Sequence, residues 1–147
     1  MACKYCHKNK PKSHRMRTSS CKAKGRRLQQ RVRDDLRAIA PALDPTDIES
    51  TPMGCNGVDV ILTKAARTVF GELAIECKNV ENLNVVRVFT DHAAKYADKI
   101  PLLVHARNNT APMVTLDWCT FLRLYLSRVI PPQNPYKPGP MLQEVNY

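Results

Sequence analysis

Three ionic residues stand in two apolar segments of the chain. Asp59 lies in "GVDVIL", and Glu76 and Lys78 lie two residues apart in "LAIECKN". Because side chains alternate along an extended strand, Glu76 and Lys78 point to one face while Ile75 and Cys77 point to the other. If the two segments are neighbouring strands, two carboxylates and one amine converge at a sheet edge. That set of groups suits metal-assisted hydrolysis of a phosphodiester.

Each of these groups has a distinct role in such chemistry. Asp59 and Glu76 provide the oxygen ligands that Mg²⁺ or Mn²⁺ prefers, and the backbone carbonyl of Cys77 could provide a third. The metal would polarise the phosphate and lower the pKa of a bound water. Lys78 could orient that water and offset the charge that grows on phosphorus. The alternative is an exposed Glu–Lys pair at a strand end, with Asp59 in a turn.

The positive charge of the chain is confined to its first quarter. Residues 1–37 hold 13 Lys and Arg against two Asp, a net charge of +11. Residues 38–147 hold 10 Lys and Arg against 11 Asp and Glu, a net charge of −1. A basic block of this kind favours a polyanion, with nucleic acid as the first candidate. The alternative is a solvated tail that aids solubility or carries a targeting signal.

Length and composition predict a soluble protein of one domain with tails. The chain has 147 residues, and no apolar run approaches the roughly 20 residues that span a bilayer. Its N-terminus is basic and polar, without the apolar stretch of a secretory signal. We therefore expect a cytoplasmic location and no membrane partner. The six cysteines are then better interpreted as thiols or metal ligands than as disulfides.

The N-terminal cysteines have the spacing of one half of a zinc site. Cys3 and Cys6 form a CxxC pair, which lets two thiolates bind one Zn²⁺. His14 and Cys21 could complete the tetrahedron, and His7 competes as a ligand. The alternative is a basic tail in which the cysteines are incidental. A folded zinc knuckle rich in Lys and Arg would grip phosphates.

Apolar periodicity predicts alternating helices and strands. Helical spacing favours a helix over residues 21–40 and another over residues 84–97, and Asp117 is the expected N-cap of a last helix at residues 118–129. Strands are expected from residue 48 and at residues 58–63, 72–78, 101–106 and 111–116, with a polar connection around residues 64–68. This order predicts an α/β protein with a mixed sheet flanked by helices.

The pattern "GVDV…ELAIECK" resembles the D…(D/E)xK signature of a large nuclease superfamily that includes restriction endonucleases and archaeal Holliday junction resolvases. "KAKGRRLQQRV" is similar to the resolvase opening, where Gly and basic residues precede a helical Glu, and Gln29 stands at that position. "ESTPMG", "GVDV" and "ECKN" together are most similar to small phage-encoded endonucleases. The resemblance covers about residues 22–125.

This resemblance implies a restriction-endonuclease-like αβββαβ core and a Mg²⁺-dependent DNA endonuclease. Asp59 and Glu76 would bind the metal, Lys78 would act on the water and Gln29 would assist. Because an amide is a weaker ligand than a carboxylate, Gln29 leaves the number of metals open, and Glu49 could supply the missing charge. The substrate would be double-stranded or branched DNA, a homodimer is a further implication, and the location would be the host cytoplasm if the gene is phage-borne.

Three segments follow from these observations. They are a basic arm at residues 1–21 with the Cys/His set, a nuclease-like domain at residues 22–129 and a Pro-rich tail at residues 130–147. In the domain, Asp91 is expected to face solvent and His92 to be a hydrogen-bonded core histidine. The side chains expected to hold the DNA backbone are Lys22, Lys24, Arg26, Arg27 and Arg31.

Two non-enzymatic hypotheses stay open beside the nuclease. One is a non-catalytic zinc-containing nucleic-acid-binding protein that keeps a nuclease-like fold, which Gln29 in place of a carboxylate favours. The other is a zinc-bearing adaptor that binds protein, although it leaves the localised charge without a purpose. Asp59, Glu76 and Lys78 argue against both, because binding alone does not need that geometry.

Overall fold

The computed structural model describes the backbone of residues 18–129 and the side chains of residues 21–126. This part contains a five-stranded sheet in the order β1-β2-β3-β4-β5 and four α-helices. The predicted α/β class with a mixed, helix-flanked sheet is therefore confirmed. The elements are α1 (Thr18–Ile39), the 3₁₀ turn η1 (Pro45–Asp47), β1 (Ile48–Ser50), β2 (Val60–Leu62), α2 (Lys64–Phe70), β3 (Leu73–Asn79), α3 (Val85–Lys95), β4 (Ile100–Ala106), β5 (Met113–Thr115) and α4 (Trp118–Val129).

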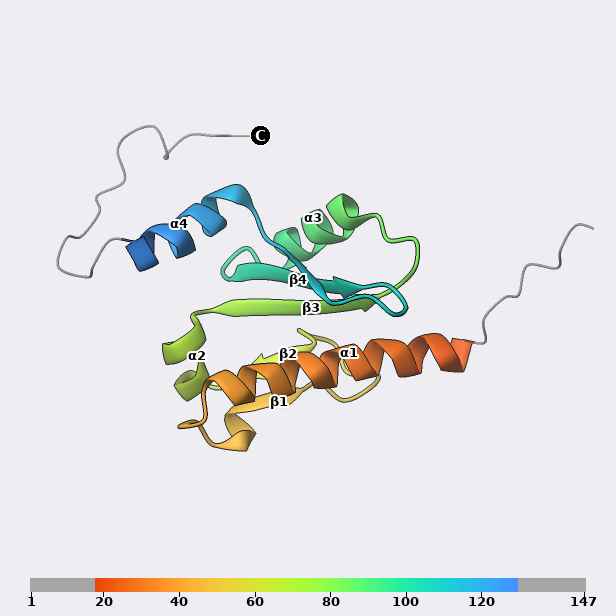
Figure 1. Ribbon diagram of the computed structural model, residues 1–147, viewed down its shortest axis with the longest axis horizontal. Helices are drawn as coiled ribbons and strands as arrows, with labels where there is room; N and C mark the ends of the chain where they lie inside the picture. The colour runs from red at the N-terminus through yellow and green to blue at the C-terminus, as the bar shows by residue number, and fades with distance from the viewer. Residues whose placement is uncertain (1–17, 130–147) are drawn as a thin grey trace, which may run out of the picture.

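The sheet is antiparallel except at its centre (Figure 1). β1 pairs with β2 and β2 pairs with β3 in antiparallel fashion, with Val60 opposite Ile75. β3 and β4 are parallel along seven residue pairs, and α3 connects them as the crossover. β5 returns antiparallel to β4 and ends the sheet. The two longest strands are thus adjacent at the centre of the fold.

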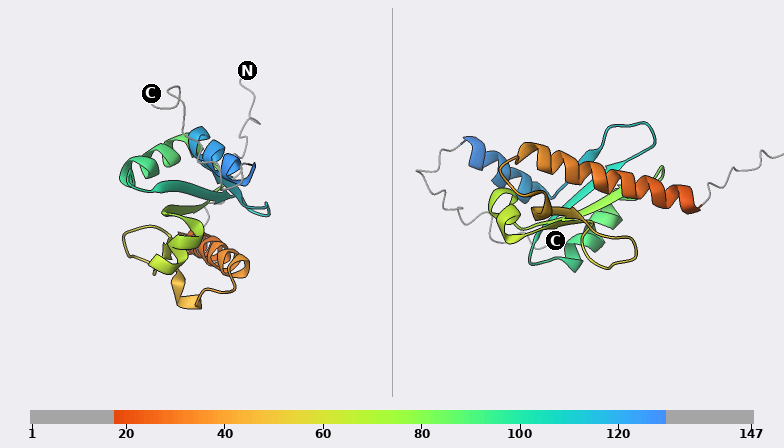
Figure 2. Two further views of the ribbon diagram at one scale, coloured as in Figure 1. Left: turned by 90° about the vertical axis from the view of Figure 1, so that its left-hand side faces the viewer. Right: turned by 90° about the horizontal axis from the view of Figure 1, so that it is seen from below.

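Helices cover the two faces of the sheet (Figure 2). On one face, Leu28 and Val32 of α1 are buried in the main core with Ile75 and Cys77 of β3. On the opposite face lies α3, whose His92 is buried against the backbone of β3. The alternation of side chains along β3 therefore sends Ile75 and Cys77 to α1 and the ionic residues Glu76 and Lys78 to the side of α3.

The polar connection expected around residues 64–68 is a helix, α2, which the sequence analysis did not predict. The Thr63 side chain caps α2 by accepting the N–H of Ala66, and Gly71, at φ 78°, ends the helix. Ala66 is the only residue of α2 that is buried. The half-buried Phe70 also packs on the core, but two positions in a seven-residue helix form no periodic stripe that the sequence could reveal.

The last helix begins where its cap predicts. Asp117 Oδ1 accepts the N–H of Thr120 at 2.9 Å, which confirms the N-cap. The apolar residues around Cys119 in the sequence favour a buried structural thiol, but Cys119 is exposed. None of the helices in residues 18–129 combines the length and the apolarity that crossing a membrane requires.

Candidate active site at the fork between β2 and β3

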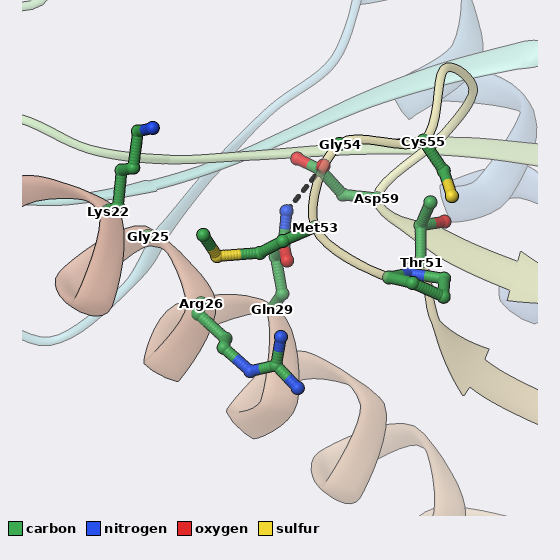
Figure 3. A pocket seen from close by; sticks show the side chains of 10 residues that line it. Lys22, Gly25, Arg26, Gln29, Thr51, Met53, Gly54, Cys55 and Asp59 are labelled. Carbon is green, nitrogen blue, oxygen red and sulfur yellow. Dashed lines mark hydrogen bonds between the residues drawn. The ribbon is translucent and has the colours of Figure 1, made fainter. Parts of the chain in front are cut away.

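Asp59 is fixed at the point where β2 separates from β3. It lies directly before β2 rather than inside the strand. Its backbone N–H donates to the carbonyl of Ile75 at 2.8 Å, and its backbone carbonyl accepts the N–H of Thr51 at 2.9 Å. Its carboxylate accepts two more hydrogen bonds, from the backbone N–H of Cys77 at 2.6 Å and from Gln29 Nε2 at 2.5 Å (Figure 3). The carboxylate therefore has a defined position between α1 and β3.

The surroundings of Asp59 disfavour the ionised form of its carboxyl group. Burial raises the pKa of the Asp59 carboxyl, and the nearby carboxylate of Glu76 raises it further. The hydrogen bonds from Cys77 and Gln29 and the charge of Lys78 act in the opposite direction but do not reverse the shift. Asp59 thus lies close enough to Glu76 and Lys78 to feel both charges. Two carboxylates in a partly buried site leave negative charge that a cation would neutralise.

Glu76 and Lys78 share one face of β3, as the strand period predicts. Lys78 Nζ forms an ion pair with Glu76 Oε1. The second oxygen of Glu76 lies 3.9 Å from Nδ1 of His92. The Nε2–H of His92 donates to the carbonyl of Ala74 at 2.8 Å, so this histidine is the hydrogen-bonded core residue that was expected. The ionic residues of β3 therefore contact each other and the buried ring of α3.

Two further acidic side chains, Asp91 of α3 and Glu49 of β1, are exposed. Asp91 is exposed and forms an i,i+4 ion pair with Arg87 at 3.8 Å, as expected for a solvent-facing residue. Glu49 is exposed on β1 opposite Ile61 and is not among the groups that shift the pKa of Asp59. A role for Glu49 in place of the carboxylate that Gln29 lacks stays a prediction.

Cys77 can contribute only its backbone to this site. Its thiol is buried in the core on the α1 side, and burial raises the pKa of the thiol to about 12, with Asp59 and Glu76 acting in the same direction. A thiol with this pKa stays protonated near neutral pH. In a strand, the N–H and C=O of one residue point to the same neighbour. The Cys77 carbonyl therefore faces the side on which its N–H meets Asp59, where it could serve as an oxygen ligand.

A pocket of about 400 Å³ opens beside Asp59, between α1 and the loop at residues 51–57 (Figure 3). From α1, Lys22, Arg26 and Gln29 line it, because side chains at positions i, i+4 and i+7 share one helix face. From the loop, Thr51, Pro52, Met53, Gly54 and Cys55 line it. The pocket thus joins two cations of α1 to the carboxylate at the fork.

The remaining basic residues predicted to bind nucleic acid lie on other faces of α1. Arg27 and Arg31 are exposed, and Arg31 forms an i,i+4 ion pair with Asp35 at 3.7 Å. Lys24 is half-buried. Of the five predicted cations, Lys22 and Arg26 are therefore the two that line the pocket beside Asp59.

The zinc prediction rests mainly on residues beyond the described part of the chain. Cys3, Cys6 and His14 lie there, whereas Cys21 is an exposed residue of α1, which begins at Thr18. Among the residues that the structure describes, no group of three or more His, Cys, Asp and Glu side chains could hold a metal ion. Zn²⁺ in the arm at residues 1–21 stays a prediction.

Sequence reasoning did not identify the loop that forms the far wall of the pocket. Gly54 and Gly57 have φ values of 88° and 140°, a backbone conformation that favours glycine and lets this loop turn back toward α1. Both glycines marked a turn in the sequence, but nothing there indicated that residues of this loop would line a pocket together with α1. Comparison with known proteins adds no constraint, since no family model, no curated protein and no solved structure matches this chain.

Proposed function

We propose that this protein is a metal-dependent endonuclease that hydrolyses phosphodiester bonds in DNA. The observation that carries the proposal is the environment of Asp59. Its carboxylate is hydrogen-bonded, and burial and Glu76 raise its pKa. Asp59 lines a pocket that is also lined by the basic side chains of Lys22 and Arg26. The arrangement of a helix, three antiparallel strands, a crossover helix and a parallel strand agrees with the restriction-endonuclease-like core that the sequence resembles.

The residues at the fork fit a Mg²⁺ ion. Mg²⁺ keeps several waters and needs only one or two protein carboxylates beside substrate phosphate, so Asp59, Glu76 and the Cys77 carbonyl are a sufficient set. Within the described residues no third His, Cys, Asp or Glu side chain joins Asp59 and Glu76 in a metal-binding group, which is compatible with that set. When bound, such an ion would polarise the phosphate and lower the pKa of a coordinated water. Mn²⁺ accepts the same ligands.

The other residues of the site assist in defined ways. The Lys78 ammonium can leave its ion pair with Glu76 to orient the attacking water and offset charge on phosphorus. Gln29 donates from Nε2 to Asp59, which fixes the carboxylate and leaves the amide oxygen for a water or a ligand. Lys22 and Arg26 can neutralise the phosphates of the strand that enters the pocket.

A second candidate function is a nucleic-acid-binding protein with this fold and without turnover. The Gln29–Asp59 hydrogen bond favours it, because an amide there satisfies Asp59 without adding a ligand charge. Both functions predict salt-sensitive DNA binding. They differ only in Mg²⁺-dependent cleavage.

The test is cleavage of branched, nicked and linear DNA by the purified full chain, with Mg²⁺, with Mn²⁺ and with chelator. We expect divalent-dependent cutting that Asp59→Ala and Lys78→Ala each abolish. Asp91→Ala is the matched control, since Asp91 is an exposed acid that pairs with Arg87 on the surface of α3, and it should cut like wild type. DNA binding without any divalent-dependent cutting would favour the second function, and cutting by the Asp59→Ala protein would refute the assignment.

A further inference from the structure

Gly25 interrupts the basic helix α1 in its interior. The helix runs over 22 residues from Thr18 to Ile39, so residue 25 belongs to neither of its ends. After proline, glycine is the residue that a helix interior favours least, because it gives up the most backbone freedom on folding. Alanine or a straight-chain side chain would stabilise α1 at this position. Gly25 therefore needs an explanation other than helix formation.

Neither packing nor backbone conformation requires this glycine. A Cβ atom at Gly25 would have no heavy atom of another element within 4 Å, so no neighbouring segment needs the space. The backbone of Gly25 is helical, whereas Gly54, Gly57 and Gly71 have positive φ values that disfavour other residues. Among the glycines in the described part of the chain, Gly25 is thus the one that the fold does not explain.

The open space at Gly25 belongs to the pocket beside Asp59 (Figure 3). Gly25 lies one helical turn before Gln29, on the same face of α1, and Gln29 donates its hydrogen bond to Asp59. Lys22 and Arg26 precede and follow Gly25 on the helix and line the same pocket. A bare stretch of helix backbone therefore lies between two cations, one turn from the residue that fixes the carboxylate.

A glycine at such a place lets a ligand approach the protein backbone closely. The attraction between Lys22 or Arg26 and an anion weakens as their distance grows, and a side chain at residue 25 would hold the anion away from α1. We propose that the sugar–phosphate backbone of the bound DNA strand packs directly against α1 at Gly25, next to the phosphate at the fork. The contact would follow the shape of the DNA backbone and would contact no base.

This inference rests on the DNA binding of the proposed function, and substitutions at residue 25 separate it from helix stability. In the full chain, Gly25→Ala should raise the thermal unfolding midpoint by about 4 °C, because alanine favours the helix. The same variant should bind duplex DNA more weakly by about tenfold in the presence of chelator, and Gly25→Leu by about a hundredfold. The expected result is a more stable protein that binds DNA less tightly.

The salt dependence of binding distinguishes a steric contact from the loss of a charge. Gly25→Ala removes no cation, so the slope of log K against log salt should equal that of the wild type while the affinity is lower at every salt concentration. With Mg²⁺ in place of chelator, kcat/KM for cleavage should fall by the same factor as the affinity. An affinity loss that comes with a shallower slope would contradict the steric contact.

Ala23→Leu is the matched control, because Ala23 is an exposed residue of α1 that does not line the pocket. This variant should bind and cut DNA like the wild type. If Gly25→Leu binds DNA as tightly as Ala23→Leu, the inference is wrong and the proposed function stands. A Gly25→Ala protein with a lower unfolding midpoint would show that the glycine serves the fold, which would also overturn the inference. Wild-type protein that binds no DNA would overturn both the inference and the proposed function.

Discussion

The two faces of β3 contact different environments although their residues alternate along seven positions. Ile75 and Cys77 point to α1 and belong to the main core. Glu76 and Lys78 point to the side of α3, where they pair with each other near the buried ring of His92. One strand thus supplies both the centre of the core and two ionic groups of the candidate site.

This difference teaches that stability and chemistry can be separated by a shift of one residue. The apolar face determines whether the sheet packs on α1, whereas the ionic face determines what the fork between β2 and β3 can bind. Asp59 couples the two, because its carboxylate accepts the N–H of Cys77 while its pKa responds to Glu76. Substitutions at neighbouring positions should therefore have effects of different kinds.

The largest effect is expected on the ionic face. Glu76→Gln keeps the shape of the side chain and removes a carboxylate, so we expect kcat/KM for Mg²⁺-dependent DNA cleavage to fall by about a thousandfold, or roughly 4 kcal/mol of transition-state stabilisation. The thermal unfolding midpoint should change little. Glu72→Gln is the matched control, since Glu72 is exposed and pairs with Arg67 at 3.2 Å. Equal cleavage by the two variants would contradict a metal-binding role for Glu76.

On the apolar face the effect should appear in stability. Ile75 is fully buried, and Ile75→Ala should lower the free energy of unfolding by about 2–5 kcal/mol, from lost burial and the cavity left behind. Urea unfolding measures this change. Val86→Ala, at an exposed position of α3, should change stability by less than about 0.5 kcal/mol. A small loss for Ile75→Ala would mean that this face does not determine the packing.

Much of this comparison follows from the sequence, and its limits have physical causes. Period-two alternation placed Ile75 and Cys77 opposite Glu76 and Lys78, and helical periodicity located α1 and α3. The pocket depends on a loop that returns to α1, which is a tertiary contact without a local pattern. α2 was missed because its single buried residue, Ala66, gives no stripe. Apolar periodicity reveals a helix or strand through the side chains that it buries, so an element that buries few side chains is not detected.

The coupling at Asp59 should appear in the pH dependence of stability. Its pKa is higher in the folded state than the ordinary 3.8, so the folded state binds more protons and stability falls as pH rises from that value through the raised pKa. Asp59→Asn cannot ionise, and its amide oxygen can still accept the N–H of Cys77. We expect the variant to unfold at a higher temperature than wild type at pH 7 and at a similar one in acid.

Mg²⁺ should narrow the difference in unfolding temperature between Asp59→Asn and the wild type at pH 7. A bound cation would stabilise the ionised carboxylate, which only the wild type has. Melting temperatures between pH 3 and pH 8, with and without Mg²⁺, measure both effects. Parallel pH profiles for the two proteins would mean that Asp59 is not destabilised by its charge.

The smallest effects are expected for Lys22 and Arg26 of α1, which under the proposed function would contact DNA from the helix that covers the apolar face of β3. Arg26→Ala removes one cation of the pocket, so the slope of log K against log salt should become shallower by about 0.9, with a few-fold loss of affinity for duplex DNA. Lys22→Ala should act similarly, and the double variant should lose about twice as much slope. Arg87→Ala on α3 is the control, because Arg87 pairs with Asp91 on the opposite side of the sheet. If Arg87→Ala changes the slope as much as Arg26→Ala, DNA contacts both sides of the sheet equally, and it does not bind preferentially at the pocket.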